Sequence, residues 1–80
     1  MDNEKKYRDR IRKLSLNIAY YRKYCGLTQE QLADKTELSR EFISRIESPE
    51  TDSTISLKTL FLLADVFSIK PYQLLIFKDD

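Results

Sequence analysis

Residues 27–47 read LTQEQLADKTELSREFISRIE, and the expected fold rests mainly on this segment. Thr28 is followed three residues later by Gln31, which is typical of a capping box at the start of a helix. Ser39 is the next capping hydroxyl, so we expect two helices at about 28–36 and 39–48 with a turn of about three residues between them. This spacing is typical of a helix-turn-helix, whose second helix enters the major groove of DNA.

The second of these helices is predicted to have one polar side and one apolar side. At about 100° per residue, the apolar sector holds Phe42, Ile43 and Ile46. The opposite sector holds the candidate base-reading residues, Arg40, Glu41, Ser44 and Arg45. Arginine can bind guanine O6 and N7 with two hydrogen bonds, and glutamate can accept one from cytosine N4. The alternative is a surface ion pair between Glu41 and Arg45 with no role in recognition.

The flanking sequence also indicates helices. Ile11, Leu14, Ile18 and Tyr21 follow helical spacing and predict a buried stripe on a first helix, which Gly26 should end. After Pro49 ends the third helix, Ser56 is expected to cap a fourth, with its inward stripe at Leu60, Leu63, Ala64 and Phe67. Pro71 suits the first turn of a fifth helix, with Leu74 and Leu75 inward. One glycine and two prolines in 80 residues do not suit an all-β chain, so the fold class is all-α with five helices.

Charge divides the chain into a basic and an acidic part. Residues 1–25 carry eight positive and three negative groups, whereas residues 26–80 carry six positive and ten negative groups. We therefore treat residues 1–13 as a basic N-terminal extension of the first helix, ahead of a domain over residues 14–77. Such an extension could lie on a phosphate backbone, or it could be a solvated helix face that keeps the protein soluble.

Composition excludes several kinds of site. The chain has no histidine, which rules out Ser-His-Asp or Cys-His catalysis and any histidine-ligated metal. The single cysteine, Cys25, is expected to be a small buried filler in a cytoplasmic protein. We expect no membrane span, no cofactor, no metal, no small-molecule ligand and no catalytic site, so the protein should not be an enzyme.

The sequence of residues 27–47, with Ile18 and Arg22 before it and residues 64–75 after it, resembles the Cro/repressor (Xre-type) helix-turn-helix family. The resemblance covers about residues 14–75. It implies a five-helix bundle of the lambda-repressor-like type that binds double-stranded DNA as a bacterial or phage transcriptional regulator. Members of this family are usually homodimers, which implies a palindromic operator read by two helices in the major groove.

The same resemblance assigns roles to individual residues. It places Arg40, Glu41, Ser44 and Arg45 at the base-reading positions. It gives phosphate contacts to Gln29 at the start of the first motif helix, with Thr28 beside it, and to Ser39. It also pairs Arg22 with Glu47 as a bridge between the first and third helices. The alternative for this pair is a loose surface contact that contributes about 0–1 kcal/mol.

The sequence departs from the family pattern at three glycines, whose places are taken by Glu37, Pro49 and Ser68. A left-handed residue other than glycine costs about 1–2 kcal/mol, so either Glu37 accepts this strain or the turn is remodelled. The loop at residues 48–55 is about two residues longer than usual, which is similar to restriction-modification controller proteins. It carries Glu50 and Asp52, so phosphate contacts from this loop should come from Ser53, Thr54 or backbone N–H groups near Ser56.

Two questions stay open at this point. Tyr72, Ile76 and Phe77 are apolar residues near the C-terminus and are candidates for a dimer interface, with packing at the end of the core as the alternative. Tyr20 and Tyr24 are expected to be half-buried.

The acidic residues near the expected DNA face favour a second function, a helical protein–protein interaction module related to antitoxins or anti-repressors, with the same fold and little or no DNA binding.

Overall fold

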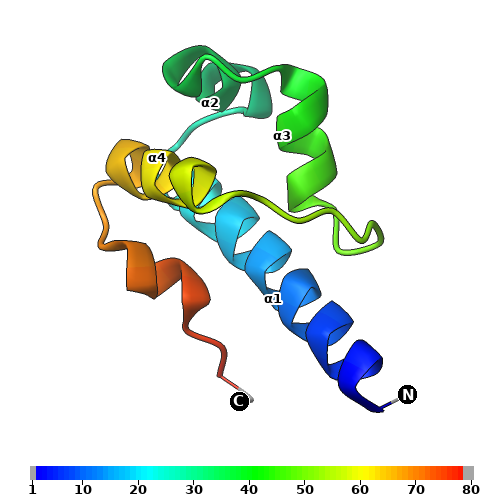
Figure 1. Ribbon diagram of the computed structural model, residues 1–80. Coiled ribbons are helices and arrows are strands. Elements are labelled where there is room, and N and C mark those ends of the chain that lie inside the picture. Colours follow the sequence, from blue (N-terminus) through cyan, green and yellow to red (C-terminus); the bar gives the residue numbers. More distant parts are fainter. Residues whose placement is uncertain (1, 79–80) are drawn as a thin grey trace.

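The computed structural model describes residues 2–78 and shows four α-helices and one short 3-10 helix within that range (Figure 1). These elements are α1 (Asp2–Tyr24), α2 (Gln29–Thr36), α3 (Arg40–Glu47), α4 (Leu57–Phe67) and the 3-10 helix η1 (Pro71–Leu75). Residues 2–13 of the predicted extension are helical and continuous with α1, while Met1 lies outside the described residues. None of the described helices has the length and apolar character that a bilayer span requires.

The prediction of five helices is wrong for the fifth, which is not an α-helix. The fifth segment is a single 3-10 helix of five residues that begins at Pro71. Asn17 explains where it ends, because its Nδ2 donates hydrogen bonds to the carbonyl oxygens of Leu74 (2.9 Å) and Ile76 (3.0 Å). These carbonyls are therefore bound to α1 rather than to a further helical turn. Leu75 is also exposed rather than inward, and only Leu74 reaches the core.

Side-chain caps begin three of the helices, as the sequence predicts. Thr28 Oγ1 accepts a hydrogen bond from Gln31 N at 3.0 Å, and Thr28 N donates to Gln31 Oε1 at 2.9 Å, which completes the capping box. Ser39 Oγ accepts from Phe42 N at the start of α3, and Ser56 Oγ accepts from Thr59 N at the start of α4. Each cap satisfies an N–H group that the helix itself cannot pair.

One hydrophobic core joins all five elements. Its buried members are Ile18, Leu32, Ala33, Ile43, Ile46, Leu60, Leu63, Ala64, Phe67 and Leu74. α2 and α3 pack against each other, α1 supports α3, and η1 lies against α1 and α4. The small side chain of Ala33 is nearly fully buried where α2 meets this core, which allows helices to approach closely. The packing therefore fixes α3 on α1 and α2 and leaves its outer side uncovered.

Two helices end on a residue that is not glycine but is left-handed. Glu37, after α2, has φ 60° and Ser68, after α4, has φ 59°, while Gly26 after α1 has φ 72°. Glu37 therefore accepts the strained conformation that the family usually gives to glycine. The turn between α2 and α3 is kept, and the chain does not remodel it.

Three further expectations about burial are wrong. Cys25 is exposed, because it follows the last residue of α1 in the turn toward α2, although its Sγ lies 3.8 Å from the carbonyl oxygen of Phe67. Tyr20 and Tyr24 are also exposed rather than half-buried. Their rings stack on each other with centroids 6.2 Å apart, so they cover one another rather than core residues.

Candidate nucleic-acid interface

α3 is held by one side and presents the other to solvent. Ile43 and Ile46 are fully buried and Phe42 is partly buried, so the helix is locked to the bundle along this side. All four candidate base-reading residues are exposed, namely Arg40, Glu41, Ser44 and Arg45. The outer side of α3 thus offers two guanidinium groups, a carboxylate and a hydroxyl on a rigid helix.

Arg45 is positioned by an aromatic ring. Its guanidinium carbon lies 5.5 Å from the centroid of the Phe42 ring, a cation–π contact worth about 0.5–1 kcal/mol at an exposed site. Within residues 2–78, no ion pair links Arg45 to Glu41. The guanidinium therefore keeps its hydrogen-bond donors directed to solvent, where a base edge could accept them.

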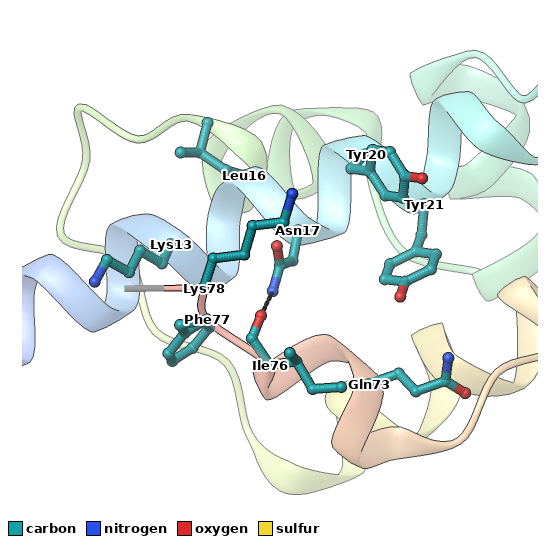
Figure 2. A pocket seen from close by; sticks show the side chains of 9 residues that line it. All are labelled: Lys13, Leu16, Asn17, Tyr20, Tyr21, Gln73, Ile76, Phe77 and Lys78. Atoms are coloured by element: carbon teal, nitrogen blue, oxygen red, sulfur yellow. Dashed lines mark hydrogen bonds between the residues drawn. The ribbon is translucent and has the colours of Figure 1, made fainter. Parts of the chain in front are cut away.

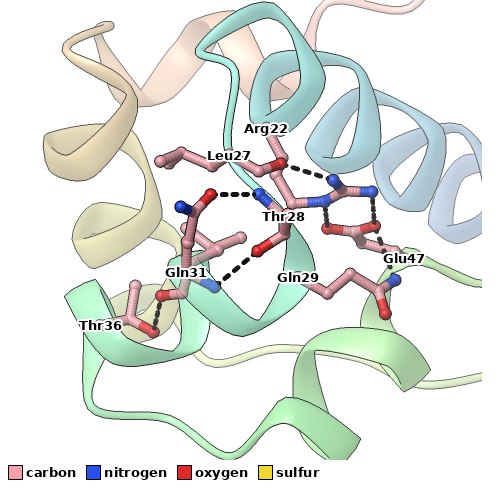
Figure 3. Close-up of polar contacts among 8 residues, drawn as sticks. Arg22, Leu27, Thr28, Gln29, Gln31, Thr36 and Glu47 are labelled. Carbon is pink, nitrogen blue, oxygen red and sulfur yellow. Dashed lines mark hydrogen bonds and ion pairs between the residues drawn. The ribbon is translucent and has the colours of Figure 1, made fainter.

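A buried ion pair joins the end of α3 to α1 (Figure 3). Arg22 Nε donates to Glu47 Oε2 at 2.7 Å and Arg22 Nη2 donates to Glu47 Oε1 at 3.0 Å, so the contact is bidentate. Arg22 Nη1 also donates to the carbonyl oxygen of Leu27 at 2.7 Å. The side chains are only 11% and 4% exposed. The pair is therefore a fixed link between helices and not a loose surface contact.

Gln29 belongs to the same cluster. Its Nε2 donates to Glu47 Oε1 at 3.1 Å, so Glu47 accepts hydrogen bonds from both α1 and α2 (Figure 3). The sequence pointed to Gln29 as a phosphate contact and missed this partner. Within the described chain the backbone N–H groups of Gln29 and Glu30 have no acceptor, and the start of a helix carries a partial positive charge. The first turn of α2 can therefore still receive an anion through its backbone.

The loop after α3 folds back on that helix. Thr51 Oγ1 donates to the carbonyl oxygens of Arg45 (2.9 Å) and Ser48 (3.2 Å). Sequence reasoning missed Thr51, because a threonine in a polar loop gives no signal that it caps the preceding helix. Ser53 is partly buried and Thr54 is exposed, and both lie in the segment that leads to α4. The acidic residues of the loop, Glu50 and Asp52, are exposed.

The candidate dimer residues lie on a different part of the molecule. Tyr72 and Ile76 are exposed and Phe77 is partly buried, all in η1 or the segment after it. Ile76 and Phe77, but not Tyr72, line a groove of about 490 Å³ between α1 and the C-terminal segment, which Figure 2 shows with Leu16 and Tyr20 on its α1 side. Asn17 lies inside this groove and binds the Ile76 carbonyl oxygen (Figure 2). No group of three or more cysteine, aspartate or glutamate residues in the described chain is arranged to hold a metal ion.

Known proteins share both this sequence pattern and this geometry. The helix-turn-helix family model matches residues 18–74, which is most of the chain. The chain belongs to this family, in its Xre-type branch. It is 41% identical over 63 residues to an uncharacterized HTH-type transcriptional regulator of Methanocaldococcus jannaschii, covering 79% of this chain and 92% of that protein. The family is one of transcriptional regulators and is not an enzyme class.

Two solved structures resemble this fold. A hypothetical transcription factor from Neisseria, NHTF, superposes with a TM-score of 0.80 at 27% identity, covering 91% of this chain and 82% of that one. The restriction-modification controller protein C.AhdI from Aeromonas hydrophila superposes with a TM-score of 0.73 at 28% identity, covering 80% of this chain and 94% of that one. The predicted similarity to controller proteins is confirmed by this second match.

Proposed function

We propose that this protein is a sequence-specific regulator that binds duplex DNA through α3 in the major groove. The observation that carries the proposal is the arrangement of α3, whose apolar side is fixed to the bundle while its four polar residues face solvent. Arg40 and Arg45 supply donors for guanine, Glu41 supplies an acceptor for cytosine, and Ser44 can donate or accept. The bidentate Arg22–Glu47 pair holds α3 at a fixed angle to α1, which base reading requires.

Phosphate contacts complete the proposed interface. The start of α2, at Thr28 and Gln29, is the main candidate. The backbone N–H groups of Gln29 and Glu30 have no acceptor there in the described chain. Ser39 begins α3 and lies next to the base-reading residues. Ser53 and Thr54 are the candidates in the loop before α4. These groups would set the position of α3 on the duplex without reading the sequence.

We further propose that the protein acts as a homodimer on a palindromic operator. Two α3 helices would then occupy half-sites about 34 Å apart on one face of the duplex. The exposed Tyr72 and Ile76, with Phe77 beside them, are the proposed contact between the subunits, since apolar side chains left on a surface mark interaction sites. Such a regulator must act in the compartment that contains the DNA, which agrees with the cytoplasmic location expected from the sequence.

Selection of bound duplexes from a random pool tests the proposal. We expect a defined site with two-fold symmetry. On that site Arg40→Ala and Arg45→Ala should each weaken binding by about 1–3 kcal/mol and relax the preference at one base pair, because each removes a base contact. Lys58→Ala, on the exposed side of α4, is the control and should change affinity little. If both arginine variants bind the selected site as tightly as the parent, the base-reading assignment is wrong.

A salt titration separates DNA binding from the alternative of a protein–protein interaction module. Binding to several phosphates releases counterions, so affinity for DNA should fall steeply as salt concentration rises. An apolar protein contact would not behave in this way. A pool that yields no enriched duplex at low salt would favour the interaction module, to which the exposed Glu41, Glu50 and Asp52 would be suited.

A further inference from the structure

A second groove, of about 440 Å³, separates the first half of α1 from the loop that follows α3. Its α1 wall is formed by Lys5, Arg8, Asp9 and Arg12. Its loop wall is formed by Pro49, Glu50, Thr51 and Asp52. Figure 1 shows this loop beside the N-terminal half of α1, away from the 3-10 helix η1. The groove thus brings together two segments that are about forty residues apart in the sequence.

The two walls carry opposite charge. Three of the four α1 residues are cationic, and they are exposed. Glu50 and Asp52 are anionic and exposed on the loop wall. Among the described residues no ion pair crosses the groove, and Arg12 pairs only with Asp9 of its own wall, at 3.8 Å. The charges of the two walls therefore interact through solvent, and salt screens this interaction because the Debye length is about 10 Å at 0.1 M salt.

The loop wall adjoins the proposed DNA face. It begins one residue after Ser48, the residue that ends α3, and Thr51 ties it to the carbonyl oxygen of Arg45. A duplex that receives α3 must therefore bring phosphates close to this loop. The carboxylates would repel those phosphates, whereas Lys5, Arg8 and Arg12 on the opposite wall would attract them.

We propose that the cationic wall of α1 is a second contact surface for the phosphate backbone of duplex DNA, and that Glu50 and Asp52 compete with the DNA for it. In the free protein the two carboxylates lie across the groove from these cations and lower the local positive potential without forming an ion pair. DNA binding displaces this interaction, which lowers the affinity for DNA of any sequence. The inference rests on the proposed function for its partner, but it concerns residues outside the helix-turn-helix.

A double-mutant cycle tests the proposal. The loop variant is Glu50→Gln/Asp52→Asn, the α1 variant is Lys5→Gln/Arg8→Gln, and the fourth protein carries all four changes. Asp34→Asn/Asp65→Asn, two exposed acidic residues of α2 and α4, is the control with the same change in net charge. Affinity for a duplex of random sequence is measured by fluorescence anisotropy at several salt concentrations.

The loop variant should bind this duplex roughly fivefold more tightly at low salt, since an exposed charge interaction is worth up to about 1 kcal/mol. Its dependence on salt should also become steeper, by about 0.9 for each phosphate gained. In the Lys5→Gln/Arg8→Gln background the gain should fall below about twofold, because the cations that the carboxylates mask are gone. The control should change affinity by less than the loop variant.

Two results would overturn the proposal. An equal gain with and without the α1 substitutions would mean that the carboxylates act directly on DNA. An equal gain from the control would mean that net charge alone is responsible. Retention on immobilised heparin is measured on the same proteins, because this polyanion needs no base reading. Failure of the parent to select a DNA site would then count against the proposed function, while the heparin cycle would still decide the role of the α1 wall.

Discussion

Glu47 is a carboxylate that is almost fully buried, and its environment explains how it is stabilised there. Arg22 binds both of its oxygens and Gln29 donates a third hydrogen bond. A buried charge costs several kcal/mol unless such partners replace its water. Because the partners come from α1 and α2 while Glu47 ends α3, a single side chain fixes three helices relative to one another.

Replacing Glu47 with alanine should destabilise the protein strongly. The change leaves the Arg22 guanidinium without its carboxylate at a site that is 11% exposed, and we expect a loss of about 3 kcal/mol in the free energy of unfolding. Urea denaturation followed by circular dichroism measures it. The matched variant Arg22→Met/Glu47→Leu removes both charges and should recover more than half of the loss. A double variant as unstable as Glu47→Ala would show that the unpaired charge is not the cause.

The sequence identified Arg22 and Glu47 as partners, but it did not show that the pair is buried. The resemblance paired Arg22 with Glu47, yet burial follows from tertiary packing that no local pattern contains. The same limit explains Gln29, for which the resemblance implied a phosphate contact at a helix start but not the hydrogen bond from its amide to Glu47. Cys25 was expected inside because cysteine is usually buried, but its place in the turn after α1 exposes it.

The turn between α2 and α3 contains a left-handed residue, Glu37, whose cost to the free energy of unfolding can be measured. Glu37 has φ 60° and ψ 24°, and its N–H donates to the carbonyl oxygen of Ala33. Glu37→Gly should raise the free energy of unfolding by about 0.5–1 kcal/mol, since relief of about 1–2 kcal/mol of strain is offset in part by the greater backbone entropy of glycine. Thermal denaturation measures the change. Ser68→Gly, at φ 59° after α4, is the comparison and should give a similar gain. If both substitutions lower the melting temperature, left-handed strain at these two ends is not a significant cost.

Helix boundaries in the chain were predictable where side-chain chemistry is local. Three helices begin where a hydroxyl accepts a hydrogen bond from the backbone N–H three residues further along. The residues are Thr28, Ser39 and Ser56, and their type and position can be read from the sequence. The fifth helix was not predictable. Its length is set by Asn17, which lies far away in the sequence and binds the carbonyl oxygens of Leu74 and Ile76. Local propensity could not reveal that contact.

The whole molecule has two sides of different chemical character. α3 packs against α1 and α2, whereas η1 packs against α1 and α4. The polar, partly basic surface lies with α3, and several exposed apolar side chains lie near η1 and the adjoining part of α1, as Figure 2 shows for Leu16, Tyr20 and Ile76. A domain of 80 residues buries only about 60% of the surface of its unfolded chain, so it cannot cover every apolar residue itself. Association through the η1 side would cover them and leave both α3 helices free for DNA.

Ile76→Asp tests that association, because it places a charge at the centre of the proposed contact. Ile76 is 56% exposed, so the subunit should still fold, while the dissociation constant of the dimer should rise at least tenfold. Sedimentation equilibrium measures it. Leu57→Asp on α4 is the matched control, since Leu57 is 69% exposed and lies outside the groove beside η1, and it should leave the dimer intact. Dissociation by Leu57→Asp but not by Ile76→Asp would move the interface to α4. In the expected case, Ile76→Asp should also weaken binding to the palindromic site while a single half-site is bound as before, because only the full site requires two linked subunits.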